Sequence, residues 1–110
     1  MRALLPLLLA LQTLSPEAAQ HMQAGISADQ QHQFDVAITE FRKVTELDPN
    51  FSDGFVSLGQ AYMEKHDFAL AISPLQHALE LNPDSAPAHQ LLGYALLVQG
   101  YAARESESHT

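Results

Sequence analysis

A sequence period of thirty-four residues constrains the fold of this chain more than any other feature. When residues 17–51 are moved forward by thirty-four positions, many of them fall on identical residues. The matched pairs are Gly25 with Gly59, His32 with His66, Phe34 with Phe68, Ala37 with Ala71, Ile38 with Ile72, Glu46 with Glu80, Leu47 with Leu81 and Pro49 with Pro83. Such a period is typical of one supersecondary unit copied in tandem, which buries its apolar face by stacking on its neighbours. We therefore expect function to lie on the surface of the stack.

Charge and cysteine content narrow the classes of partner and chemistry. The 110 residues include thirteen Asp and Glu against five Lys and Arg, for a formal net charge of −8. Nucleic acids and anionic membrane surfaces are bound through clustered basic residues, so we expect neither as a partner. The chain has no cysteine. Disulfides, a thiolate nucleophile and Cys-ligated zinc are thereby excluded, although the compartment is not identified.

The amino terminus has the layout of a secretory signal. Arg2 is followed by the Leu-rich run 3–11, and no further charge occurs before Glu17. The run is too short for a membrane-spanning helix, and it lacks the polar face of an amphipathic cap on the first repeat, which is the alternative. We expect 1–15 to be a signal peptide or apolar leader, although no good cleavage site follows the run. A cleaved leader would make the protein secreted or periplasmic, and otherwise it would be cytoplasmic.

Helical periodicity and turn residues divide the rest of the chain into five expected helices. Ser15, Pro16 and Glu17 form a helix start, with a hydroxyl N-cap, a proline at the first helical position and an acid near the positive helix end. Proline turns at 48–50 and 82–84 end the second and fourth helices. The expected helices are 16–30, 34–47, 51–65, 68–81 and 86–99.

Local details of these helices are also predicted. Asn50 and Asp67 are expected to cap the third and fourth helices. Pro74 lies inside the fourth helix, where it should leave one carbonyl unpaired and bend the axis, at a cost of ~3 kcal/mol unless packing compensates. After Tyr101 the apolar pattern fails, so we expect 102–110 to be a polar tail.

The spacing of large and small residues resembles the signature of the tetratricopeptide repeat. Phe55, Leu58, Gly59 and Tyr62 carry the resemblance in one helix of the second unit, and Phe68, Ala71, Leu75, Ala78 and Pro83 in the next. The first copy has smaller side chains, with His21 and Ala24 at positions where large apolar residues are usual. The resemblance implies an all-α fold of antiparallel helix pairs stacked as a short superhelix, with repeats at about 18–51, 52–85 and a partial 86–101 within a domain of residues 16–101.

Small residues at helix crossings and large residues between them are expected to hold the repeats together. Gly59 should let two helices approach closely, while Ala71 and Ala78 keep their crossing tight. The expected packing residues are Gly25, Phe34, Ala37, Phe41, Pro49, Phe55, Leu58, Gly59, Tyr62, Phe68, Ala71, Leu75, Ala78, Pro83, Leu92 and Gly93.

No pattern in the sequence indicates catalysis, a metal site or a cofactor. The six histidines lack the helical spacing and the close acidic partners of a zinc site. His32 and His66 share one repeat position and are expected at turns. His21 and His89 correspond to Phe55 and are expected to be partly buried, each with one hydrogen bond. No nucleophile triad, phosphate loop or carboxylate pair is found, so we expect a protein that is not an enzyme.

The resemblance implies a concave groove, lined by the first helix of each repeat, that binds extended peptides or partner helices. We expect about half of its residues to pack between repeats instead. None of the five basic residues lies on this face, so an apolar or basic protein or peptide is the expected ligand, and not the acidic carboxyl terminus bound by the chaperone-binding branch of the family. The groove residues would be Met22, Ile26, Asp29, Asp53, Val56, Gln60, Met63, Glu64, Gln90, Tyr94 and Leu97.

The helix 86–99 carries more apolar surface than one preceding repeat can cover, which motivates an alternative function. Leu92, Leu96 and Val98 contribute to this surface, whereas terminal repeats normally present a polar outer face. Either the chain is a structural self-association module that forms a homo-oligomer through this helix, or it is a shortened member of a longer array.

Overall fold

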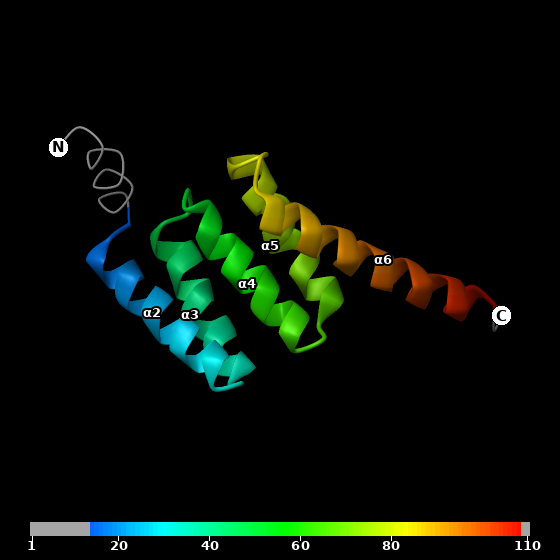
Figure 1. Ribbon diagram of the computed structural model, residues 1–110, viewed down its shortest axis with the longest axis horizontal. Helices are drawn as coiled ribbons and strands as arrows, with labels where there is room; N and C mark the ends of the chain where they lie inside the picture. Colours follow the sequence, from blue (N-terminus) through cyan, green and yellow to red (C-terminus); the bar gives the residue numbers. More distant parts are fainter. Residues whose placement is uncertain (1–13, 109–110) are drawn as a thin grey trace.

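The computed structural model describes residues 14–108, and this part of the chain is built of α-helices without strands. Residues 1–13, which include most of the expected leader, lie outside the described residues. The helices are α2 (Pro16–Gln30), α3 (Phe34–Leu47), α4 (Ser52–Glu64), α5 (Phe68–Leu81) and α6 (Ala86–Ser108). Adjacent helices pack in pairs, α2 with α3 and α4 with α5, as Figure 1 shows. The predicted all-α stack of helix pairs is confirmed.

Helix bounds agree with the prediction except at the last helix. α2, α3 and α5 have the expected bounds, and α4 is one residue shorter at each end. α6 does not end at Gln99 but continues to Ser108. Ala102, Ala103 and Arg104 are strong helix formers, so intrinsic propensity extends the helix although its apolar pattern has stopped. The prediction that the last helix ends before a polar tail at 102 is therefore wrong.

The predicted N-cap positions of Ser15 and Asp67 are confirmed, and that of Asn50 is wrong. Ser15 Oγ accepts the Ala18 N–H at 3.1 Å, and the Ser15 N–H donates to Asp48 Oδ2 at 2.9 Å, which joins the start of α2 to the end of α3. Phe51, and not Asn50, takes the N-cap position of α4, because α4 begins at Ser52, one residue later than expected. Asp67 lies at the N-cap of α5 but makes no capping bond, since its carboxylate is turned toward Lys65.

Two histidines occupy left-handed backbone positions at the turns inside the helix pairs. His32 has a φ of 59° and His66 a φ of 67°. At the first turn the Gln33 N–H donates to the Ala28 carbonyl and the His32 N–H to the Asp29 carbonyl, a pattern that closes a helix end and usually takes glycine at the left-handed residue. Each imidazole also lies 5.7 Å, centroid to centroid, from the Phe two residues on. The prediction that these histidines are turn residues is confirmed.

The crossing inside each complete pair is built from a glycine and a large side chain. A Cβ added at Gly25 would lie 2.7 Å from Phe41 Cδ1, and one at Gly59 would lie 2.6 Å from Leu75 Cδ2. Phe41 and Leu75 are buried, as are the small residues Ala37, Ala71 and Ala78. Leu58 and Tyr62 are also buried, whereas Phe34, Phe55, Phe68 and Leu92 are only half-buried and Pro49 and Pro83 are exposed.

The third repeat departs from this plan. Gly93 occupies the same repeat position as Gly59, yet a Cβ added at Gly93 would have no atom of the described residues within 4 Å. α6 packs on α5 and on part of α4, and its carboxyl-terminal half continues past both of them (Figure 1). The prediction that Gly93 is a packing residue is therefore wrong, because no helix of the described part of the chain crosses α6 there. Within residues 14–108, no helix has the length and apolar character needed to cross a membrane.

Candidate functional site

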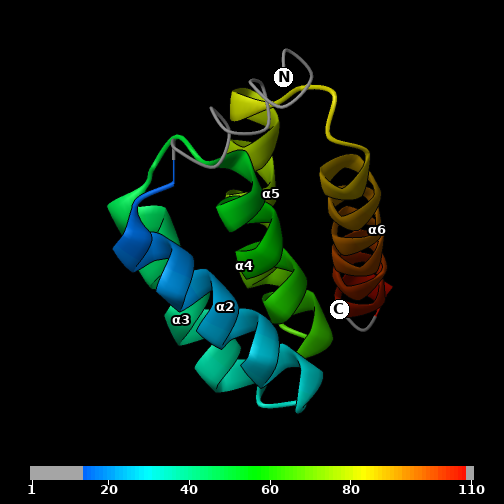
Figure 2. The same ribbon diagram turned by 60° about the vertical axis from the view of Figure 1, so that its left-hand side comes forward.

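The first helices of the successive repeats lie one after another across one face of the stack. Figure 2 shows α2, α4 and α6 in this order, with α3 and α5 behind them. A pocket of about 90 Å³ opens between α2 and α4. Its lining residues are Ile26 and Asp29 from α2, Phe41 from α3, and Ser57, Gln60 and Glu64 from α4. Four of these six, Ile26, Asp29, Gln60 and Glu64, are residues that the repeat positions predict to line a groove.

Two carboxyl groups meet in this pocket without a cation between them. Burial first, and then the neighbouring Asp29 carboxyl, raise the pKa of Glu64 from 4.5 to about 7, while the Gln60 side chain has a smaller, opposite effect. Asp29 Oδ1 and Glu64 Oε1 are both buried, and neither accepts a hydrogen bond from any residue that the structure describes. A buried acceptor without a donor is costly, so the pocket favours a bound proton or a bound donor.

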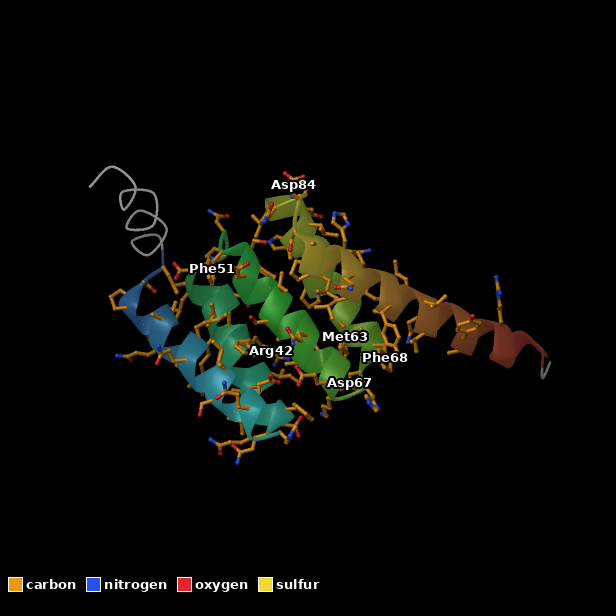
Figure 3. All side chains as sticks on the ribbon, viewed as in Figure 1. Arg42, Phe51, Met63, Asp67, Phe68 and Asp84 are labelled. Carbon is orange, nitrogen blue, oxygen red and sulfur yellow. The ribbon has the colours of Figure 1, made fainter. Side chains whose placement is uncertain are left out.

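Lys65 and Arg42 directly follow pocket residues in the sequence, but both contact other side chains. Lys65 Nζ lies 2.7 Å from Asp35 Oδ1 and 3.7 Å from Asp67 Oδ2, and both acids, Asp35 more than Asp67, raise the pKa of Lys65. Arg42 is labelled in Figure 3. Its guanidinium donates to the Tyr62 hydroxyl, which links α3 to α4. Among the described residues, neither Lys65 nor Arg42 forms an ion pair with Asp29 or Glu64.

The remaining predicted groove residues differ in their exposure. Asp53, Gln90, Tyr94 and Leu97 are exposed, Val56 is half-buried and Met22 packs against the core. The prediction that Met63 lines the groove is wrong. It is only 8% exposed and belongs to the core cluster that includes Ala95, because the packing of α6 on the α4–α5 pair covers it.

Sequence reasoning missed two lining residues, Ser57 and Phe41. Ser57 precedes Gln60 by one helical turn, so an i, i+3, i+7 stripe from Ser57 to Glu64 could have found it. Phe41 was expected to serve packing alone. Its ring fills the space at Gly25 and also forms part of the pocket wall.

The histidines bond within the protein and lie away from the pocket. His21 is half-buried as expected, and its Nδ1 lies 2.6 Å from Glu40 Oε2, which links α2 to α3. His89 also has one hydrogen bond, with Nε2 2.7 Å from the Pro83 carbonyl, but it is exposed and not partly buried as expected. Within residues 14–108, no three His, Asp or Glu side chains are grouped so that they could hold a metal ion.

The fold defines a helical-repeat protein built of stacked antiparallel helix pairs. Comparison with protein-family models finds the tetratricopeptide repeat over residues 22–86 and again over residues 56–105, and the chain belongs to this family. The two matches begin thirty-four residues apart, which is the period of the sequence. Repeats of this family commonly mediate protein–protein interactions, and the family is generally a non-catalytic scaffold. No curated protein matches the chain.

Proposed function

We propose that this protein is a non-catalytic module that binds a protein or peptide segment along the groove and takes a basic side chain into the pocket between α2 and α4. The observation that carries the proposal is the pair of buried carboxylate oxygens, from Asp29 and Glu64, that lack a donor among the described residues. A Lys or Arg side chain of a partner supplies both the donors and the charge that these oxygens need.

The size and walls of the pocket support a side chain as ligand. About 90 Å³ has room for several water molecules and hence for the head of a long side chain, whereas small-molecule sites usually measure about 300–1,000 Å³. Ile26 is 44% exposed at the rim, where it can contact the methylene stem of Lys or Arg. Arginine is favoured, because its planar fork of donors can reach two carboxylates at once.

A series of short peptides tests the proposal. The peptides are identical except for a central Arg, Lys, Gln or Glu between leucines, and binding is measured by fluorescence anisotropy. We expect the Arg peptide to bind at least about tenfold more tightly than the Gln peptide, as one charge-assisted pair is worth about 1.5–3 kcal/mol. The double variant Asp29→Asn, Glu64→Gln should lose this preference, and the exposed Asp53→Asn on the same helix as Glu64 should keep it. Equal binding of the four peptides, or none up to millimolar concentration, would overturn the proposal.

A second candidate function is self-association through α6. Tyr94, Leu97 and Tyr101 recur at helical spacing and are between 55% and 62% exposed, so a row of large apolar residues faces solvent. Of the residues that motivate this alternative in the sequence, Leu96 is 48% exposed and lies beside this row, whereas Leu92 and Val98 are half-buried. Sedimentation velocity over a range of concentrations tests it, and a chain that stays monomeric at the highest concentration removes it.

A further inference from the structure

The outer face of α6 carries two glycines beside open space and two exposed tyrosines. A Cβ added at Gly93 or at Gly100 would have no atom of the described residues within 4 Å, and Tyr94 and Tyr101 are 55% and 62% exposed. We propose that α6 pairs antiparallel with α6 of a second copy of this chain, about a two-fold axis at Leu97. This inference rests on the self-association proposed above and specifies its partner and register.

Among the described residues, no side chain fills the space beside Gly93. At the two equivalent positions the space beside the glycine is filled from the following helix, by Phe41 at Gly25 and by Leu75 at Gly59. The helix that follows lies antiparallel to its partner in both complete pairs. An antiparallel helix from outside the chain would therefore restore at Gly93 the crossing that the first two repeats make internally.

The positions of the glycines and tyrosines define one register. Leu97 lies four residues from both Gly93 and Tyr101, and three residues from both Tyr94 and Gly100. In an antiparallel pair centred on Leu97, each exposed tyrosine is level with a bare glycine of the other copy. A two-fold interface requires this kind of correspondence, since the same patch must fit itself. The missing side chain of each glycine lets the backbones approach and leaves room for an aromatic ring.

The place of α6 in the fold leaves this face open. The carboxyl-terminal half of α6 extends beyond α4 and α5, which leaves its outer face accessible to a second molecule (Figure 1). The buried residues Ala88 and Ala95 lie on the other face, against the body of the protein.

The distribution of charge favours a second copy as the occupant. Each molecule carries a net charge of −8, so two copies repel over most of their surfaces. Residues 85–103 contain no Asp, Glu, Lys or Arg. This uncharged strip is therefore the surface on which two copies meet with the least repulsion, whereas it offers no charge to attract a basic partner of the kind that suits the pocket.

Single cysteines test the register directly, because the natural chain has none. In the full-length Leu97→Cys variant the two cysteines lie at the two-fold axis, so mild oxidation should yield a covalent dimer. Tyr101→Cys should not cross-link, because its counterpart in the pair is at position 93 and the two cysteines would be about 12 Å apart along the axes. Leu70→Cys, at an equally exposed site on α5, is the control. Cross-linking of Tyr101→Cys as readily as Leu97→Cys would indicate a parallel pair and overturn the proposal.

A charge substitution separates the register from self-association itself. Leu97 and Leu70 are 56% and 57% exposed, so Leu97→Glu and Leu70→Glu introduce the same charge at matched sites without removing a buried side chain. We expect Leu97→Glu to weaken dimerisation at least tenfold and Leu70→Glu to weaken it much less. A dimer that tolerates Leu97→Glu uses another surface, which overturns the register but not self-association. A wild-type chain that never dimerises overturns both.

Discussion

At the scale of single residues, Glu64 links the fold to the proposed binding. Its pKa of about 7 in the folded protein, raised mainly by burial and then by Asp29, compares with 4.5 in the absence of these effects. The folded protein therefore binds more protons than the unfolded chain between about pH 4.5 and pH 7. Because the unfolded chain releases this proton first, the contribution of Glu64 to stability is present below pH 4.5 and is lost as the pH rises through about 7.

The substitution Glu64→Gln tests this linkage. Glutamine keeps the shape but cannot ionise, so the variant should unfold at a higher denaturant concentration than the wild type at pH 8 and at a similar one at pH 4.5. Urea titrations across this pH range, followed by circular dichroism, give the comparison, with the exposed Glu46→Gln as the control. A variant no more stable than the wild type at pH 8 would contradict the account of this site.

Part of the site was predictable from residues and part was not. The repeat positions of Asp29 and Glu64 place each of them on the groove face. Their meeting was not predicted, because they are thirty-five residues apart and so do not share a repeat position. The contact depends on how closely α2 approaches α4. Met63 was predicted for the groove but is buried, because the packing of α6 determines which side of α4 is covered.

At the scale of elements, the helix pairs follow from their sequences because the turns and crossings are encoded locally. The proline turns and the apolar stripes predicted four helices to within one residue at each end. Gly25 and Gly59 identified the close crossings because glycine and a large residue recur at one spacing. The end of α6 was not predicted, since the residues after Tyr101 favour a helix through propensity alone and form no periodic pattern.

Alanine substitutions at two equivalent glycines test whether a helix is packed beside each of them. Leu75 lies against Gly59, whereas no described atom lies close to Gly93. In Gly59→Ala the new methyl group would overlap Leu75, so we expect the free energy of unfolding to fall by about 1–3 kcal/mol. In Gly93→Ala the methyl group has open space, and the gain in helix propensity should raise stability by up to about 1 kcal/mol. Denaturation of both variants at low protein concentration measures these changes, and a loss of stability in Gly93→Ala would show that α6 is crossed after all.

At the scale of the whole molecule, the two proposals use different surfaces with different electrostatics. The pocket between α2 and α4 gathers negative charge in a protein whose net charge is already −8. The outer face of α6 is uncharged from residue 85 to residue 103. Pairing through α6 would place two grooves in one particle, which would raise the avidity for a partner with two basic segments.

The affinity for the Arg-centred peptide as a function of pH tests the central claim most directly. The arginine of the peptide stays charged at every pH used. A change in affinity with a midpoint near pH 7 therefore reports the protonation of Glu64. Ionised Glu64 rises from about a tenth of molecules at pH 6 to about nine tenths at pH 8, so calorimetry should show binding about tenfold tighter at pH 8. In Glu64→Gln this dependence should disappear. Affinity that is independent of pH, or a dependence that survives in Glu64→Gln, would contradict the claim that the acidic pocket binds the ligand.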